Sequence, residues 1–509
     1  MLHLPSRRAR GLGTALLIAA SLPAAGCFSL RPSQGGGETT LEGDPPIGPD
    51  AIALPDGYRI DRIASDLTFP TAIVFDDAGT AYVIESGYSY GEVWTVPRLL
   101  RLEEDGSLAE VARGGDNGPW TGATWGNGHF YVAEGGRKQG GKILRISRDG
   151  KMEALVVGIP SKGDHAVNGP VLGADGFLYF TVGTATNSGV VGADNVAFGW
   201  VDDDPDFHDV PCEDLILNGV NFITPNPLAA DKAEVETGAF VPFGTRTEKG
   251  QKIPGAVPCS GSVLKMKPEP GAPVELVAWG FRNPFGIAFA PDGKLFVTDN
   301  AYDDRGTRPV YGAGDLLWAV RPGTWYGWPD FHGARMLDYG DYYDPPGRNA
   351  PEMLLAAHPN VPPEPTAILA VHSSTNGFDF STNEEFGFVG QAFLAQFGDM
   401  APAVGKVLAP VGYKVVRMDL ETGLSEDFAV NRGETNGPAS WLRVPGLERP
   451  VEARFDREGK ALYVVDFGVL LQKEEKSLPQ PGTGCVWRIT RDPRALPGPL
   501  ALSPRGVAP

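Results

Sequence analysis

The strongest constraint on the fold is a hairpin pattern that recurs six times along the chain. Each copy has an apolar strand, a turn that contains Asp-Gly or a similar pair, and a second strand of aromatic and apolar residues that usually ends on a polar residue. Turn pairs of this kind between apolar runs predict β-hairpins. The copies lie at residues 74–85, 125–134, 172–183, 289–299, 380–396 and 455–466.

A further apolar strand follows each hairpin, and small sheets repeated in this way bury their faces only against neighbouring sheets around a ring. These third strands lie at residues 99–102, 143–146, 263–266, 316–320, 415–418 and 486–489. We therefore predict an all-β fold, a six-bladed β-propeller with loop insertions, over residues 55–493. A pair of β-sandwiches is the alternative, but nothing in a sandwich requires a sixfold repeat.

The spacing of the repeats predicts loop insertions at about residues 187–260, 330–376 and 472–482, and long insertions in a compact fold tend to be functional. Many tight turns are expected, because the chain has 67 glycines and 46 prolines. Its 44 Lys and Arg against 63 Asp and Glu give a net charge of −19. A surface of this sign repels phosphate backbones, so nucleic acid is excluded as an expected partner.

The N-terminus has the pattern of an export signal. Arginines at 7, 8 and 10 precede an apolar run over 12–22, and small residues then lead to Cys27. We interpret residues 1–27 as a signal peptide with a lipobox-like end, in which Cys27 is lipidated, and ordinary secretion with cleavage nearby is the alternative. Residues 28–54 are predicted to be a flexible tether, and 494–509 a C-terminal tail. The predicted location is periplasmic or at the cell surface of a bacterium, with the lipid anchor as the only membrane contact.

Export places the remaining cysteines in an oxidising compartment. Cys212 and Cys259 flank a segment rich in glycine and proline, and we predict a disulfide between them. Cys485 then has no partner and is expected to be a buried residue in a strand.

Hairpin geometry predicts which residues meet at one face of the ring. In an antiparallel pair, the residue that begins the first strand and the residue that ends the second lie at the same end. Counting back seven residues from the first apolar residue of each repeat places His165 and Arg282 at equivalent positions of adjacent blades. One position later, Asn283 and Arg449 are equivalent to each other. The second strands end on a largely acidic ring, made of Glu85, Glu134, Asp299, Gln396 and Asp466.

These residues suggest a chemistry, and each has a plainer alternative. His165 is a candidate general base near neutral pH, tuned or oriented by Asp164, unless the pair is a surface turn. Arg282 offers a fixed cation for charge that develops on an oxygen, unless it binds loop carbonyls. The acidic ring is a candidate site for calcium, unless its carboxylates only hydrate the channel or bind neighbouring blades.

Several motifs make the chain similar to a known family. Residues 160–165 lead into the third hairpin, and the Gly-Phe-Arg-Asn-Pro-Phe-Gly segment at 280–286 leads into the fourth, followed by Trp-Tyr-Gly-Trp-Pro at 325–329. This combination resembles the glucose/sorbosone dehydrogenase family, whose members are soluble six-bladed quinoproteins. The resemblance covers about residues 55–490.

The resemblance implies oxidation of a sugar or polyol hydroxyl by pyrroloquinoline quinone (PQQ) with calcium, followed by electron transfer to an external acceptor. His165 would take the hydroxyl proton, and Arg282 with Asn283 would hold the reactive quinone oxygen. The implied site residues also include Asn300, Ala301, Tyr302 and Arg449 for the cofactor, and Asp299, Ala301, Tyr302 and Asp315 for the metal.

The chain departs from the family in its fifth blade. It reads Gln-Phe-Gly-Asp-Met at 396–400, where quinone-binding members supply lysine and arginine. Candidate replacements for these cations are Lys406, Lys414, Arg246 and Lys249. Our leading prediction is a PQQ-dependent sugar or polyol dehydrogenase. The alternatives are a calcium-dependent hydrolase such as a sugar lactonase, and a noncatalytic propeller that binds carbohydrate or a partner.

Overall fold

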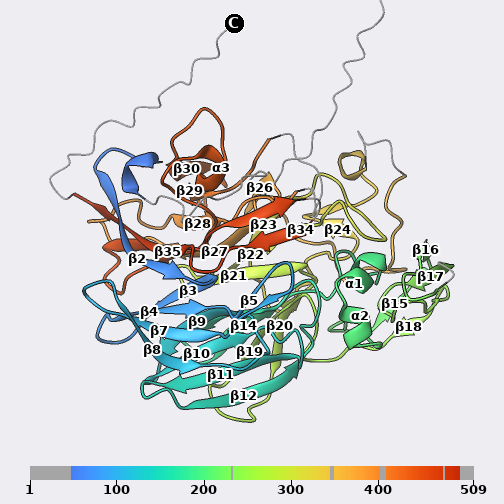
Figure 1. The fold of residues 1–509 in the computed structure, drawn as a ribbon. Helices are drawn as coiled ribbons and strands as arrows, with labels where there is room; N and C mark the ends of the chain where they lie inside the picture. Colours follow the sequence, from blue (N-terminus) through green and yellow to red (C-terminus); the bar gives the residue numbers. More distant parts are fainter. Residues whose placement is uncertain (1–47, 231–232, 344–348, 402–408, 474–475, 493–509) are drawn as a thin grey trace, which may run out of the picture.

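Six antiparallel sheets surround a common axis in the computed structural model, which describes residues 48–230, 233–343, 349–401, 409–473 and 476–492 (Figure 1). The first strand of each sheet contacts the first strands of the two neighbouring sheets, so these six strands line the axis. The predicted six-bladed β-propeller is thereby confirmed, and the sandwich alternative is wrong.

Blades 1 to 3 follow one another directly along the chain, each with four strands. Blade 1 contains β3 (Pro70–Phe75), β4 (Ala81–Glu85), β7 (Arg98–Leu102) and β8 (Leu108–Arg113). Blade 2 contains β9 (Trp120–Gly126), β10 (His129–Glu134), β11 (Gly141–Ser147) and β12 (Met152–Ile159). Blade 3 contains β13 (Val167–Leu172), β14 (Leu178–Val182), β19 (Ser262–Met266) and β20 (Glu275–Trp279).

Blades 4 to 6 complete the ring, and two of them use strands from the N-terminal side of the chain. Blade 4 contains β21 (Asn283–Phe289), β22 (Leu295–Asn300), β23 (Gly314–Ala319) and β26 (Ala367–Val371). Blade 5 contains β27 (Thr375–Phe380), β28 (Ala392–Gln396), β29 (Lys414–Met418), β30 (Ser425–Asn431) and β1 (Ile52–Ala53). Blade 6 contains β31 (Pro450–Phe455), β32 (Ala461–Asp466), β35 (Gly484–Arg491) and β2 (Tyr58–Leu67).

The ring is closed by pairing between the two ends of the described chain. Strand β2 forms the outer strand of blade 6 by pairing with β35, and the short β1 adds a fifth strand to blade 5. The 3-10 helix η1 (Pro49–Ala51) precedes them. The end of the predicted tether at 48–54 is therefore part of the folded structure. The predicted signal peptide, Cys27, the rest of the tether and the predicted tail lie outside the described residues.

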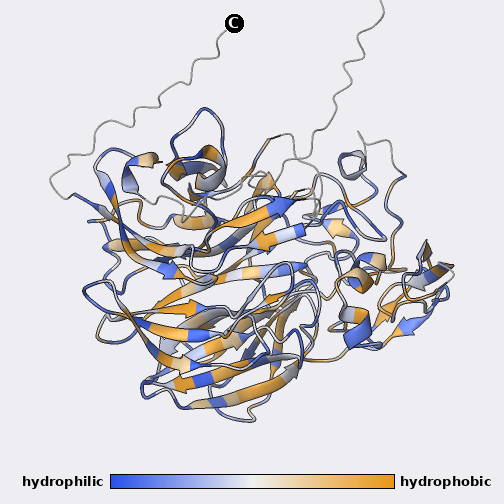
Figure 2. Cartoon of the chain, viewed as in Figure 1, coloured by the Kyte–Doolittle hydropathy of each residue, from blue (hydrophilic) through white to orange (hydrophobic). Residues whose placement is uncertain are grey.

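The hydrophobic core lies between the blades. Inner strands such as β3 and β28 are buried on both faces, whereas outer strands such as β12 have several exposed residues. Figure 2 shows the same pattern, with apolar residues concentrated along the strands. Each sheet therefore depends on its two neighbours to bury its faces, which is why the sixfold repeat predicts the ring.

Every blade has a register shift between its first and second strands, near the end where the first strand begins. Such β-bulges bend a strand and redirect its side chains. At this end of the axis the first residue of each blade pairs with the last residue of the second strand, as Asn283 does with Asn300. The predicted convergence of strand starts and strand ends is thus present.

Three insertions extend from the blades and lie close to the predicted segments. Between β14 and β19 lie α1 (Ala193–Ala197), α2 (Trp200–Asp203), β15 (Leu215–Ile216), β16 (Asn221–Pro225), β17 (Glu234–Gly238) and β18 (Lys252–Ile253). This insertion forms a lobe at the side of the propeller (Figure 1). The other insertions contain β24 (Phe331–His332), β25 (Arg335–Met336) and η2 (Gly340–Tyr342), and the hairpin β33 (Leu470–Lys473) with β34 (Lys476–Pro479).

Two shorter elements complete the chain, the hairpin β5 (Tyr88–Ser89) with β6 (Val93–Trp94) and the helix α3 (Ala439–Leu442). A disulfide joins Cys212 and Cys259, the pairing expected from the sequence, with the Cα atoms 5.0 Å apart. Cys485 is buried as a free thiol. Within the described ranges, none of the helices has the length and apolar character needed to cross a membrane.

Candidate active site

A cavity of about 440 Å³ lies where the strand starts and strand ends of the blades converge. Most of the residues predicted for catalysis, for the cofactor or for the metal line it. They are Asp164, His165, Arg282, Asn283, Asn300, Ala301 and Asp315. The structure therefore brings the residues of blades 3 and 4 together, as the equivalence of His165 and Arg282 predicts. We call this cavity the chamber.

His165 lies just before β13 and is buried, with 7% of its surface exposed. Its Nδ1 lies 2.8 Å from the carbonyl oxygen of Thr184. Because a carbonyl oxygen only accepts, we assign the ring hydrogen to Nδ1, which leaves the lone pair on Nε2. Burial, together with the charges of Arg282 and Arg305, lowers the pKa of His165 well below 6.5. The imidazole is therefore neutral at neutral pH, as a general base must be.

A glycine makes room for this histidine. In blade 3 the second strand ends at Val182 and is followed by Gly183, the position that Ser86 holds in blade 1 and Gly135 in blade 2. A Cβ atom at Gly183 would lie 2.2 Å from the Cβ of His165, which no packing tolerates. The absence of a side chain at position 183 is thus the local reason why the ring can carry a histidine here.

Asp164 does not orient His165, contrary to the expectation from the sequence. Its Oδ2 accepts a hydrogen bond from Nη2 of Arg305 at 2.7 Å, and Thr184 holds the imidazole instead. Neighbouring side chains of an extended segment point to opposite sides, so adjacent residues seldom bind one another. Thr184, 19 residues after His165, therefore has the orienting role that the sequence assigned to Asp164.

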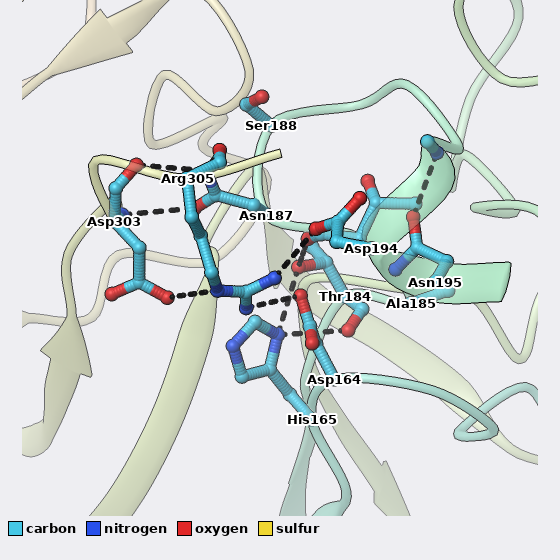
Figure 3. Close-up of polar contacts among 12 residues, drawn as sticks. Asp164, His165, Thr184, Ala185, Asn187, Ser188, Asp194, Asn195, Asp303 and Arg305 are labelled. Carbon is cyan, nitrogen blue, oxygen red and sulfur yellow. Dashed lines mark hydrogen bonds and ion pairs between the residues drawn. The ribbon is translucent and has the colours of Figure 1, made fainter. Parts of the chain in front are cut away.

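Arg305 lines the chamber and binds three carboxylates (Figure 3). Its guanidinium lies 2.7 Å from Asp164, 2.8 Å from Asp194 and 3.1 Å from Asp303. Burial alone would lower the pKa of Arg305, but the charges of these three carboxylates outweigh burial and raise it. The network ties the start of blade 3, the insertion and the loop after β22 to one another.

Arg282 is held by the same loop and by Asn187. Its Nη2 donates to Oδ2 of Asp303 at 2.7 Å and to Oδ1 of Asn187 at 2.9 Å, and its Nη1 donates to the carbonyl oxygen of Asn300 at 3.2 Å. A guanidinium has five N–H groups, and Nε also binds Asn187. One N–H of Nη1 is left without an acceptor among the described residues. It is the donor that Arg282 can offer to an oxygen in the chamber.

The predicted acidic ring has a structural role. The two carboxylate oxygens of Asp466 accept backbone N–H groups of Arg449 and Glu448, both at 2.8 Å. Asp299 likewise accepts the backbone N–H groups of Arg282 and Asn283, at 3.1 and 2.8 Å. These carboxylates join the end of the second strand to the start of the first strand within one blade, and neither lines the chamber.

The residues predicted for calcium do not form a calcium site. Asp315 lines the chamber, but its carboxylate accepts the backbone N–H groups of Ala301 at 3.1 Å and Thr375 at 2.7 Å. Asp299 is occupied as described above, and Tyr302 is buried outside the chamber with its hydroxyl on Phe331. No group of three or more His, Cys, Asp or Glu residues suited to a metal exists in the described part of the chain. Calcium prefers six to eight oxygen ligands, and the side chains of Asp299, Asp315 and Tyr302 are already bound to other groups.

Arg449 is not a chamber residue either, contrary to the prediction for the cofactor. It is fully buried in blade 6, where its Nη1 donates to the carbonyl oxygens of Gly398 and Asp399, both at 3.2 Å. The repeat pattern predicts where Arg449 lies along the strand but not the direction in which its side chain points. The plainer alternative for Arg282, an arginine that binds loop carbonyls, describes Arg449, and it describes Arg282 in part through the carbonyls of Asn187 and Asn300.

Three of the four cations proposed as replacements are not at the site. Lys414 pairs with Asp427 on an outer strand, and Arg246 pairs with Glu236 at 2.9 Å in the insertion. Lys249 does not line the chamber, and Lys406 lies outside the described residues. The cations that do line the chamber are Arg282, Arg305 and Lys476.

Sequence reasoning missed several chamber residues because they lie in loops with no counterpart in the other blades. They are Tyr88, Tyr90, Glu92, Phe198, Trp200, Asp303, Arg305, His372, Ser374 and Lys476. One signal was available, since the run Asp-Asp-Arg at 303–305 directly follows the strand that ends on Asn300. The insertion contributes Trp200 and Phe198, whose rings stack with centroids 4.7 Å apart.

Comparison with solved structures finds the same fold in other proteins. The chain shares its fold with the PQQ domain of a pyranose dehydrogenase. That domain, from Coprinopsis cinerea in its holo form, is 14% identical, with a TM-score of 0.53 over 89% of this chain and 100% of the domain. A calcium structure of a Trichoderma reesei carbohydrate-active enzyme of family AA12 is 17% identical, with a TM-score of 0.51 over 89% of this chain and 100% of that one.

These likenesses confirm, at the level of the fold, the resemblance to sugar-oxidising quinoproteins. At such low identity they establish the fold alone. Comparison with protein-family models finds no match, and comparison with curated proteins finds none either.

Proposed function

We propose that this protein is an oxidoreductase that oxidises a hydroxyl of a sugar or polyol, with PQQ as the electron acceptor in the chamber. The observation that carries the proposal is the arrangement of His165 and Arg282 in the chamber. A buried neutral imidazole has its Nδ1–H fixed by Thr184, and a guanidinium with one N–H to spare lines the same cavity. Proton acceptor and cation are the two groups that alcohol oxidation requires from the protein.

The chamber fits PQQ in size and in donors. Its volume of about 440 Å³ lies within the range of roughly 300–1,000 Å³ typical of small-molecule sites. Arg282, Asn283 and the exposed Lys476 are the residues that would hold the quinone, beside the aromatic wall of Phe198 and Trp200. When bound, PQQ supplies a two-electron acceptor for the hydride of a carbinol. The residues examined for calcium do not fit that ion, so our mechanism assigns it no step.

The residues of the chain divide the remaining work. His165 accepts the hydroxyl proton at Nε2, and the carbonyl of Thr184 stabilises the imidazolium that results by keeping the bond to Nδ1–H. Arg282 directs positive charge at an oxygen in the chamber. Arg305 holds Asp164, Asp194 and Asp303 in place, and together with Arg282 it keeps Asp303 ionised.

In the first test, purified protein is titrated with PQQ, with and without calcium, and binding is followed by the absorbance of the quinone. Reduction of an artificial dye is then measured with a panel of aldoses and polyols. We expect saturable PQQ binding and dye reduction, and we expect His165→Gln to lower turnover by about 10²- to 10⁴-fold while PQQ still binds. His129→Gln is the matched control, because His129 begins β10 outside the chamber, with its Nδ1 at the carbonyl oxygen of Asn127.

The result also decides between the alternatives. Calcium-dependent lactone hydrolysis without dye reduction would favour a hydrolase, although the carboxylates predicted to hold calcium accept backbone N–H groups. If neither activity is found and sugars bind equally well to wild type and His165→Gln, the propeller is a noncatalytic binding module.

We further propose that the protein is exported, lipid-anchored through Cys27, and oxidised by an external electron acceptor. The disulfide between Cys212 and Cys259 supports an oxidising compartment. The mass of the mature protein isolated from membranes tests the anchor. The expected mass shows a diacylated or triacylated Cys27, and Cys27→Ala should release the protein into the soluble fraction.

A further inference from the structure

A second, deeper cavity of about 100 Å³ lies on the propeller axis and shares His165 and Asn283 with the chamber. Residues from all six innermost strands line it. They are Thr71, Thr121, Asn168, Phe285, Asn376 and Val451. The wall is completed by Arg137, from the loop between β10 and β11, and by Ser89. We call this cavity the axial pocket.

Arg137 is buried in this wall without a hydrogen-bond partner for most of its guanidinium. Only 6% of its side chain is exposed, and neither Nε nor Nη1 has a partner within the described residues. The nearest carboxylate oxygen, Oε1 of Glu92, lies 3.9 Å from Nη1 and accepts the hydroxyl of Tyr88. The guanidinium lies over the rings of Tyr88 and Trp200, at 4.3 and 5.1 Å from their centroids.

Stacking on aromatic rings satisfies the faces of a guanidinium but not its N–H groups, which point outward in the plane. A buried charge without hydrogen bonds is among the most unfavourable arrangements in a protein interior. Arg305 shows the contrast, because it binds three carboxylates in the same part of the molecule. The unpaired N–H groups of Arg137 therefore indicate an acceptor supplied from outside the chain, and a planar carboxylate matches them best.

The axial pocket also has unpaired acceptors. Oδ1 of Asn168 and Oδ1 of Asn376 are buried and have no donor within the described residues, and the hydroxyl of Ser89 is likewise unpaired. The side chain of Asn168 is fixed, because its Nδ2 donates to the carbonyls of Ala166 and Pro284, at 3.2 and 3.4 Å. These oxygens require hydrogen-bond donors, which hydroxyl groups provide.

We propose that Arg137, Asn168 and Asn376 form a subsite for a polyhydroxy acid, so that the substrate is a sugar acid rather than a neutral sugar. The carboxylate binds Arg137, hydroxyls donate to the two asparagines, and the carbinol to be oxidised lies in the chamber at His165. The subsite proposal rests on the proposed function only for the oxidation step. The carboxylates of PQQ would match Arg137 equally well, but PQQ has a single N–H donor for the acceptors of the pocket.

The experiment measures binding by calorimetry without PQQ, so that it needs no turnover. Glucuronate and gluconate are compared with glucose and sorbitol. We expect wild type to bind the acids roughly 10- to 100-fold more tightly, the range expected for a hydrogen bond to a charged group. Arg137→Gln should abolish this preference, and Arg137→Lys should retain part of it. Lys138→Gln is the control, because Lys138 is the exposed neighbour that pairs with Asp116 at 3.2 Å.

Asn376→Asp provides a second variant that keeps the shape of the side chain and places a negative charge in the pocket. It should weaken binding of the acids more than binding of glucose, because only the acids carry a negative charge. Equal affinity of wild type for glucuronate and glucose, or a preference unchanged in folded Arg137→Gln, would overturn the proposal. Loss of PQQ binding in Arg137→Gln with unchanged glucuronate binding would assign Arg137 to the cofactor and overturn it too. Absence of dye reduction alongside an intact acid preference would count against the proposed oxidation, not against the subsite.

Discussion

Replacing Arg305 with methionine should destabilise the protein strongly, because Arg305 is the shared partner of three carboxylates. Its guanidinium binds Asp164, Asp194 and Asp303 at 2.7, 2.8 and 3.1 Å. Removing one partner of a buried ion pair typically costs about 3–5 kcal/mol, since the other charge stays buried and unpaired. Arg282 still binds Asp303 in the variant, at 2.7 Å, so we expect the total to stay within this range.

The expected change in melting temperature follows from the size of the protein. An unfolding entropy of about 2.1 cal/mol/K per residue gives roughly 1 kcal/mol per degree for a propeller of this length, so Arg305→Met should lower Tm by about 3–5 °C at pH 7. Unfolding can be followed by intrinsic fluorescence, because the chain has 10 tryptophans. Arg113→Met is the control. Arg113 forms an exposed pair with Glu110, and we expect no measurable change in Tm.

Acid should reduce the difference between wild type and Arg305→Met. In the wild type, burial raises the pKa of Asp303, but Arg282 and Arg305 outweigh it and bring the pKa below its usual value. A lowered carboxylate pKa stabilises the folded state at neutral pH, and this stabilisation is lost as pH falls. The variant has less of this stabilisation to lose as pH falls, and it becomes more stable when its unpaired carboxylates bind protons. A variant that melts within about 1 °C of wild type at pH 7, or a difference that does not shrink in acid, would refute this account of the network.

Four further outcomes are expected. Turnover should fall on the acid side only at pH well below 6.5, because burial and the charges of Arg282 and Arg305 lower the pKa of His165; an acid limb near 6.5 in the pH–rate profile would argue against His165 as the base. Gly183→Ala should lower kcat by up to about 10²-fold through displacement of His165, whereas Gly115→Ala, which meets no atom within 4 Å, should not. Replacing both Cys212 and Cys259 with serine should reduce the free energy of unfolding by about 4 kcal/mol, the loop entropy for a separation of 47 residues, as measured by denaturant titration. Asp299→Asn should leave any calcium-dependent shift in Tm unchanged. Burial raises the pKa of Asp299 to about 7, so wild-type stability relative to this variant should fall as pH rises from about 4 to about 7.

The blades were predictable from the sequence because their signals are local. Asp-Gly turns and alternating apolar strands lie within a dozen residues of one another, and the same period places His165 and Arg282 in equivalent positions. The proximity of these two side chains to one chamber follows from the repeat alone. The pairing of Cys212 with Cys259 could also be predicted, because it depends on an oxidising compartment and on the number of remaining cysteines.

Partners that lie far apart in the chain were decided by tertiary packing. Ring closure pairs β2 with β35, whose residues Arg59 and Thr490 are separated by 431 positions, and no local pattern identifies such a pair. The same holds for side chains. The sequence places Asp164 beside His165, Asp299 in an acidic ring and Arg449 at a strand start, but only the folded chain shows that Arg305, backbone N–H groups and loop carbonyls bind them instead. A buried polar group binds the partner that packing brings within about 3 Å, and in a propeller that partner usually comes from another loop or blade.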